Sequence, residues 1–327
     1  MLIFYTIKNF IKKNKFTNFL VILNKNYFRN ILFLVKFIFS KKKIIENYKK
    51  KFSQNNFKSK DGGNVKIYEN ALETYPDDYF INYPYENLEK KTKEFLPNIT
   101  FIFDVGANIG IWTIPKRLSF NQDVKFYCFE PSKIIHEYLT KNLSEYQNTY
   151  IYNCALSDKD GYENLSLSLE AIRNGRYFST GLGSLKFKTF FFNEKVQTFK
   201  FDTFFKKNLN EIVNKKDSQI LIKVDIEGNE LEFLNGGKEI LNELNNIIIE
   251  MEFNKKSFFY LKEDYEYNFK KRIDILKKLG FKKVFYENKK KEIHIINLLD
   301  FDIQKFFEKK LDKKEIYVIN FFFVKVN

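Results

Sequence analysis

From residue 99 onward, short runs of apolar residues alternate with stretches whose apolar positions recur every three or four residues. The apolar runs predict buried strands, and the amphipathic stretches predict helices that cover them. The strands are expected at Thr100–Val105, Val124–Glu130, Thr149–Cys154, Gln219–Asp225 and Asn246–Met251. The helices are expected near Trp112–Ser119, Ser132–Leu143, Asn229–Leu244 and Tyr265–Leu279. This alternation is typical of a doubly wound α/β sheet.

Further β-like stretches follow the last predicted helix, which Gly280 is expected to end. They lie at Lys283–Tyr286, Ile293–Asn297 and Ile316–Val326. We expect them to close the sheet, although the pattern alone does not give their order.

The chain carries a net charge of +15, and nearly all of it lies in the first 60 residues. That segment has 15 Lys or Arg and one acid, Glu46, whereas the remainder has 41 bases and 40 acids. A nearly neutral body argues against a groove that follows a phosphate backbone, so nucleic acid is not expected as a partner. The basic arm instead suggests contact with an anionic surface.

The arm contains apolar runs at 19–23, 31–35 and 37–39, all shorter than the roughly 20 residues that span a bilayer. Two interpretations stay open: a helix lying in the membrane interface, with Lys41–Lys43 at the headgroups, or a basic helix packed on the domain. We therefore divide the chain into a basic amphipathic extension, 1–60, and a catalytic domain, 61–327, with its motif core at 99–255.

Two cysteines, Cys128 and Cys154, fall inside apolar runs and are expected to be buried thiols. Unpaired thiols fit a reducing compartment. We therefore expect a cytoplasmic protein, peripheral at the inner face of the membrane if the arm binds lipid.

Polar residues follow the predicted strands where each one ends. In a parallel sheet these ends meet at one edge, where ligands bind. The residues are Asp104 with Gly106 and Gly110, then Glu130, then Ser157 and Asp158, then Asp225 and Glu227, and finally Glu250.

The glycine loop after the first strand distinguishes between two nucleotide cofactors. A dinucleotide site requires G-x-G-x-x-G, so that bare backbone approaches the pyrophosphate. Here Asn108 stands at the second glycine position and would crowd that approach. S-adenosylmethionine has no pyrophosphate, and it needs an acid for its ribose, for which Glu130 is suitably spaced. The loop therefore favours S-adenosylmethionine over a dinucleotide.

Five blocks in order resemble the FkbM family of class I S-adenosylmethionine-dependent methyltransferases. The resemblance covers about residues 65–280, with Phe201 in place of the usual Leu and Pro115 early in a helix as departures. The blocks are DVGANIG at 104–110, FEPS at 129–132, NCALSD at 153–158, VQTFKFDTFF at 196–205, and LIKVDIEGNELEFLNGG at 221–237 followed by IIIEMEF at 247–253.

The resemblance implies a Rossmann-like sheet of about seven strands whose last strand is antiparallel. It implies that Glu130 accepts the ribose hydroxyls and that Ser157 and Asp158 meet the adenine edge. The methionine portion would be cradled by Asp104, Gly106, Asn108 and Gly110.

Asp225, Glu227 and Glu250 are the candidate catalytic residues, because a carboxylate can remove the proton of an acceptor hydroxyl. Asp225 and Glu227 are also the candidate ligands of a divalent cation such as Mg²⁺. The alternative is structural, since acids at 227–230 can cap the following helix. An insertion from Glu163 to Phe192 is expected near the acceptor, where Arg173, Arg176 and Tyr177 could contact it or lie in an ordinary exposed loop.

The family resemblance implies O-methylation of a saccharide or a glycan-lipid precursor. Two alternatives come from other classes. The first is a nucleic-acid methyltransferase that uses the basic arm. The second is a non-catalytic, membrane-associated protein that retains the fold.

Overall fold

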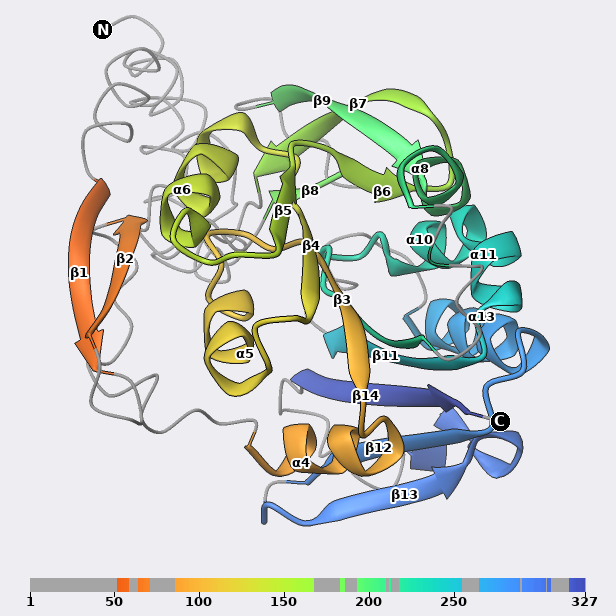
Figure 1. Cartoon of the computed structure of the whole chain (residues 1–327). Helices are drawn as coiled ribbons and strands as arrows, with labels where there is room; N and C mark the ends of the chain where they lie inside the picture. The colour runs from red at the N-terminus through yellow and green to blue at the C-terminus, as the bar shows by residue number, and fades with distance from the viewer. Residues whose placement is uncertain are drawn as a thin grey trace, which may run out of the picture.

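The computed structural model describes residues 52–58, 64–70, 86–167, 183–185, 193–209, 212, 218–254, 265–288, 290–303, 305–306 and 318–326. Within them, eight strands form one sheet in the order β13-β12-β14-β11-β10-β3-β4-β5 (Figure 1). The strands are β3 (Ile99–Val105), β4 (Lys125–Phe129), β5 (Thr149–Tyr152), β10 (Gln219–Val224), β11 (Asn246–Asn254), β12 (Lys283–Glu287), β13 (Ile293–Asn297) and β14 (Val318–Lys325).

The sheet confirms the predicted doubly wound class. Strands β5, β4, β3, β10 and β11 are parallel, and the chain order reverses between β3 and β10. The last strand, β14, pairs antiparallel with β11, as predicted. It also pairs with β12, and β13 adds a further antiparallel strand at the edge.

Alternate strand residues face opposite sides of the sheet and pack under separate helices. In β3, Ile102 faces the side covered by α5 (Thr113–Ser119) and α6 (Lys133–Leu143). Phe103 faces the other side (Figure 1). That side is covered by α8 (Phe201–Asn208), α10 (Glu230–Gly236), α11 (Lys238–Glu243) and α13 (Tyr265–Lys278). Burying each such side chain contributes roughly 1.5–3 kcal/mol.

One predicted helix, Asn229–Leu244, forms as two helices, α10 and α11, that meet at Gly237. A Cβ on the neighbouring Gly236 would lie 2.0 Å from the carbonyl oxygen of Ser157. The absence of a side chain there lets the backbone of another strand touch the helix.

That strand belongs to a second sheet, which the sequence pattern did not predict. Its order is β6-β9-β7-β8, with β6 (Ala155–Ser157), β7 (Gly161–Leu167), β8 (Gly183–Ser184) and β9 (Asn193–Lys200). The third strand of the main sheet was expected to run to Cys154. The chain instead leaves that sheet after Tyr152, and β6 pairs with β9.

The N-terminal part of the description holds a hairpin, β1 (Phe52–Lys58) with β2 (Asn64–Asn70), and helix α4 (Glu86–Phe95). Strand β2 lies beside α6 (Figure 1). The expected boundary at residue 60 falls between the two hairpin strands. Residues 1–51, which hold most of the predicted basic arm, lie outside the described residues, so its helical character stays a prediction.

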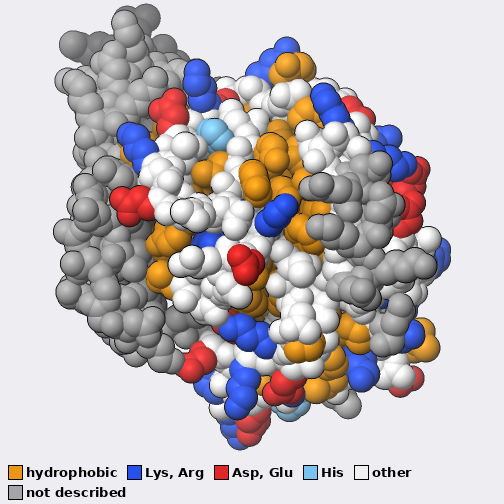
Figure 2. All heavy atoms as spheres, viewed as in Figure 1, with side chains coloured by type: hydrophobic (Ala, Val, Ile, Leu, Met, Phe, Trp, Pro, Cys, Tyr) orange, Lys and Arg blue, Asp and Glu red, His pale blue; other side chains and the backbone are white. Residues whose placement is uncertain are grey.

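The described surface carries charges of both signs (Figure 2). On the face in Figure 2, Lys and Arg side chains are interspersed with Asp and Glu around a central group of hydrophobic side chains. Among the described helices, none combines the length and apolar character needed to cross a bilayer. Cys128 and Cys154 are buried free thiols, as predicted.

Candidate functional site

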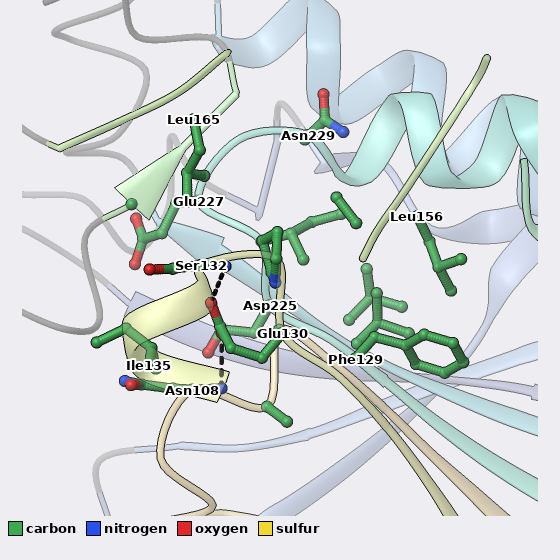
Figure 3. A pocket seen from close by; sticks show the side chains of 18 of the residues that line it. Asn108, Phe129, Glu130, Ser132, Ile135, Leu156, Leu165, Asp225, Glu227 and Asn229 are labelled. Atoms are coloured by element: carbon green, nitrogen blue, oxygen red, sulfur yellow. Dashed lines mark hydrogen bonds between the residues drawn. The ribbon is translucent and has the colours of Figure 1, made fainter. Parts of the chain in front are cut away.

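A cavity of about 290 Å³ opens at the carboxyl ends of the parallel strands, at the point where the chain order reverses. The main sheet supplies one wall and the second sheet another (Figure 3). The polar residues and glycines that line it include Gly106, Asn108, Glu130, Ser132, Ser166, Gly183, Glu194, Lys223, Asp225, Glu227, Asn229, Glu250, Glu252 and Asn320.

Gly106 lies at the closest approach between the loops that follow β3 and β10. Its φ is +83°, and a Cβ built on it would lie 2.0 Å from the carbonyl oxygen of Asp225. A side chain is excluded both by this contact and by the left-handed backbone. Gly110 also has a positive φ, but it packs against Leu139 and does not line the cavity.

Asn108 presents a buried polar atom that no other residue in the described part of the chain contacts by a hydrogen bond. Its φ is +51°, a conformation that Asn tolerates better than most residues. Its backbone N–H donates to Glu130 Oε2 at 3.1 Å, whereas its buried Oδ1 has no hydrogen-bond partner among the described residues. The indole Nε1 of Trp112, which also lines the cavity, is likewise buried without a hydrogen-bond partner among the described residues. Buried polar atoms of this kind require a partner, which a bound ligand would provide.

Glu130, at the end of β4, is held by two backbone donors. Oε2 accepts from Asn108, and Oε1 accepts from the N–H of Ser132 at 2.9 Å (Figure 3). Burial raises the pKa of Glu130 to about 7, against the opposing effect of the Ser132 and Asn108 hydrogen bonds. This carboxyl therefore titrates near neutral pH.

Lys223, inside β10, joins both halves of the site and was not among the residues predicted from the sequence. Its Nζ donates to the carbonyl of Gly106 at 2.8 Å and lies 3.1 Å from Asp104 Oδ1 and 3.6 Å from Asp225 Oδ2. Burial alone would lower the pKa of Lys223, but the carboxylates of Asp104 and Asp225 raise it. A lysine within the apolar run ILIKV was the signal that could have revealed it.

Asp104 itself is fully buried and does not line the cavity. It accepts a hydrogen bond from Thr113 Oγ1 in α5. Asp104 thus lies behind the glycine loop, paired with Lys223.

The three predicted catalytic acids, Asp225, Glu227 and Glu250, all line the cavity. Glu250 Oε1 accepts from Asn320 Nδ2 at 3.1 Å. Burial raises the pKa of Glu250 to about 7, although the positive charges of Lys116 and Lys223 oppose the shift. Two further polar residues were missed, Glu252 and Asn320, which the β11–β14 register places opposite each other.

The two residues predicted to meet adenine, Ser157 and Asp158, do not line the cavity. Ser157 is buried in β6, where its Oγ lies 3.3 Å from Asn229 Nδ2, and Asp158 is exposed. The backbone turn into the second sheet instead directs Ala155 and Leu156 to the cavity.

Strands β8 and β9 of the second sheet are also hydrogen-bonded to the site. Glu194 on β9 accepts from Ser132 Oγ and from the N–H of Lys133, both at 2.8 Å. Ser184 Oγ on β8 donates to the carbonyl of Glu227 at 2.8 Å. Parts of the predicted insertion therefore border the cavity, whereas Arg173, Arg176 and Tyr177 lie outside the described residues.

Metal binding by Asp225 and Glu227 stays a prediction. In the part of the chain that the structure describes, no group of three or more His, Cys, Asp or Glu is arranged to hold a metal ion.

Comparison with known proteins identifies the family. Residues 104–283, more than half of the chain, match the methyltransferase FkbM domain. The chain belongs to the FkbM methyltransferase family. This confirms the resemblance inferred from the sequence blocks and makes S-adenosylmethionine the expected methyl donor. No curated protein sequence matches the chain.

The solved structures similar to this FkbM methyltransferase include three other methyltransferases. Precorrin-6y C5,15-methyltransferase from Geobacter metallireducens is 9% identical, with 74% of this chain and 89% of that chain covered and a TM-score of 0.35. TYW2 of M. jannaschii, in complex with AdoMet, is 12% identical, with 84% and 87% covered and a TM-score of 0.36. An O-methyltransferase from Thermotoga maritima is 9% identical, with 84% and 78% covered and a TM-score of 0.36. At these scores the family assignment depends on the domain match.

The pKa of Glu130 predicts that cofactor affinity depends on pH. S-adenosylmethionine carries a positive sulfonium, so it should bind best when Glu130 is ionised. Because the pKa of Glu130 is about 7, its ionised fraction falls about tenfold from pH 8 to pH 6, and we expect the Kd to rise by about tenfold over the same range. Isothermal titration across this range measures the effect. The Glu130→Gln variant should bind more weakly and lose this dependence, and a full dependence in the variant would contradict the assignment.

The raised pKa of Glu250 predicts that the free energy of unfolding decreases as pH rises. Its folded pKa of about 7 exceeds the reference value of 4.5, so its contribution is complete below pH 4.5 and is lost as pH rises through 7. Glu250→Gln should therefore stabilise the protein at pH 8, on the order of 3 kcal/mol, and change little at pH 4.5. Urea unfolding at the two pH values measures this. If Glu250→Gln changes the free energy of unfolding equally at pH 8 and pH 4.5, Glu250 does not have the raised pKa.

Proposed function

We propose that this FkbM methyltransferase transfers a methyl group from S-adenosylmethionine to a hydroxyl oxygen of a saccharide or glycan-lipid precursor. The supporting observation is the joint lining of one cavity by two sets of residues. Gly106, Asn108 and Glu130 suit the cofactor, and the carboxylates of Asp225, Glu227, Glu250 and Glu252 suit a hydroxylated acceptor. The saccharide class itself comes from the family resemblance.

The cofactor half of the cavity has the chemistry that S-adenosylmethionine requires. Glu130 would accept ribose hydroxyls, and the free Oδ1 of Asn108 would accept from the amino group of the methionine portion. The apolar side chains of Ile135, Leu156 and Leu165 would pack on adenine. When bound, the cofactor supplies an electrophilic methyl group on a positively charged sulfur.

The acceptor half would bind hydroxyl groups and hold one for reaction. Asp225 is 35% exposed at the cavity wall, so it can accept the proton that the hydroxyl loses as its oxygen bonds to the methyl group. Glu250, with a pKa of about 7, can both accept and donate a hydrogen bond near neutral pH. The excess of carboxylates disfavours a phosphate at this end of the cavity.

The basic arm would bring the enzyme to an anionic membrane surface, where a lipid-linked acceptor would be found. This part of the proposal is supported by the 15 Lys or Arg against one acid in residues 1–60. It implies a cytoplasmic enzyme held at the inner face of the membrane. A divalent cation at Asp225 and Glu227 would assist deprotonation, and addition of a chelator tests for it.

Incubation with methyl-labelled S-adenosylmethionine tests the proposal. Cell extract is separated into lipid, glycan, RNA and protein fractions, and label is expected in the glycan or lipid fraction. The Asp123→Asn variant controls for a general effect of changing an Asp to Asn. Asp123 is exposed and lies outside the cavity, so this variant should label the same fraction as wild type.

Three outcomes would contradict the proposal. Label in RNA would support the nucleic-acid alternative, particularly if RNA binding at low salt is lost on deletion of residues 1–60. Label in protein would exclude a saccharide acceptor. No label together with no cofactor binding in calorimetry would support a non-catalytic protein that retains the fold.

A further inference from the structure

A buried ion pair lies behind the acceptor half of the site, outside the cavity lining. Arg272 Nη2, from α13, is 2.6 Å from Oε2 of Glu230, the first residue of α10. The two side chains are 0% and 4% exposed. Removing both charges from water is costly, and such a pair is often no more stabilising than apolar residues of similar size. Stability alone therefore does not account for this buried pair.

The second carboxylate oxygen of Glu230 holds the loop that carries Glu227. Oε1 accepts the N–H of Gly228 at 3.1 Å and of Ile226 at 3.3 Å, on either side of Glu227. Glu227 has a φ of +50°, which is unfavourable for a residue with a side chain. Since Ser184 donates to the Glu227 carbonyl from the second sheet, the loop is held from two sides.

Arg272 is itself fixed from three directions. Its Nε donates to Asn268 Oδ1 at 2.8 Å, and its Nη1 donates to the carbonyl of Glu252 at 3.5 Å. Its guanidinium lies 5.3 Å and 5.4 Å from the ring centroids of Phe253 and Phe269. Because Glu252 lines the cavity, Arg272 connects the end of β11 to the loop after β10.

We propose that Glu230 and Arg272 are positioning residues for the acceptor side of the reaction. They fix the loop 225–228 and the end of β11 relative to each other, so that Asp225 and Glu227 face the acceptor. Neither residue contacts the cavity. This inference rests on the proposed function, in which these two acids bind and deprotonate the acceptor.

Two double variants differ in the group offered to the loop. Glu230→Gln with Arg272→Met removes both charges but keeps an amide oxygen for the two N–H groups. Glu230→Leu with Arg272→Met removes the charges and the acceptor oxygen. Neither variant leaves an unpaired buried charge, so both should fold. Amide hydrogen exchange of the peptide containing 226–228 reports the loop directly, without any acceptor.

The measurements are made on the full chain. For Glu230→Leu/Arg272→Met we expect at least tenfold faster exchange at 226–228, at least tenfold lower kcat with the labelled fraction of cell extract as acceptor, and a cofactor Kd within twofold of wild type. Glu230→Gln/Arg272→Met keeps an acceptor oxygen for the loop but loses the contact with Glu252 on β11. For this variant we expect a kcat three- to tenfold below that of wild type. Arg272→Lys keeps the charge but cannot reach all three partners, and should lower kcat by three- to tenfold.

The outcomes separate positioning from a general structural role. Unchanged exchange and kcat in the folded Leu/Met variant would overturn the inference. Parallel losses of kcat and cofactor affinity would also overturn it, because they indicate general disruption. If the Leu/Met variant does not fold, a kcat within twofold of wild type in both Arg272→Lys and the Gln/Met variant would overturn the inference. Failure of the proposed function would appear in the wild-type labelling, whereas failure of this inference appears in the variants.

Discussion

Replacing Asp225 by Asn is expected to lower kcat by about 100- to 10,000-fold, the usual contribution of a general base. The carboxylate lies on the cavity wall at the end of β10, 3.6 Å from Lys223 Nζ. Asn has the same size and can still accept a hydrogen bond, but it cannot take up the proton of the acceptor hydroxyl at neutral pH. Cofactor binding should be retained, because the residues assigned to the cofactor come mainly from the loops after β3 and β4.

The measurement compares label transfer rates and calorimetric cofactor affinity for Asp225→Asn, Asp123→Asn and wild type. A rate in Asp225→Asn within threefold of wild type would exclude Asp225 as the base. Glu227 and Glu250 would then be tested in the same way, since both line the same cavity.

The second large effect is expected for Lys223→Met, which should destabilise the fold by about 3–5 kcal/mol. The change leaves Asp104, which is fully buried, without its charged partner 3.1 Å away. It also removes the donor to the Gly106 carbonyl, so the glycine loop loses its attachment to β10. Urea unfolding at pH 7.5 measures the loss, and cofactor affinity should fall with it.

A double variant separates lost charge pairing from lost packing. Asp104→Asn removes the buried carboxylate, so Asp104→Asn/Lys223→Met should recover part of the stability that Lys223→Met loses. Additive losses would mean that the two side chains do not interact in the folded protein, contrary to the geometry.

The sequence predicted the main sheet well because its strands are nearly continuous apolar runs separated by amphipathic helices. Each predicted strand formed within a few residues of its expected limits. Most residues at the ends of the main-sheet strands converged on the cavity, whereas Asp104 lies buried behind the glycine loop. Glu130, Asp225 and Glu250 reached the cavity for this reason. Asn108 also lines the cavity, on a loop whose Gly106 and Ala107 N–H groups donate to the carbonyl of Phe129.

The second sheet was not predicted from the sequence pattern, for a physical reason. Its strands are short and mix polar with apolar residues, so a period of two is hard to distinguish from a loop. This misplaced Ser157, which was expected at the end of a main-sheet strand and lies instead in β6. Glu230 and Arg272 were missed because their 42-residue separation hides a contact that depends on how α13 packs against α10.

The backbone contact between Gly106 and Asp225 has an implication for how the enzyme could be altered. Because no side chain fits between these loops, the loop proposed to bind the cofactor and the loop that carries the proposed base are in direct backbone contact, so a shift of one would displace the other. The walls contributed by β7, β8 and β9 are attached through the hydrogen bonds that Glu194 accepts from Ser132 and Lys133 and the one that Ser184 donates to Glu227. An engineer seeking a new acceptor would therefore exchange residues between Asp158 and Lys200 other than Leu165, and leave the loops after β3 and β10 untouched.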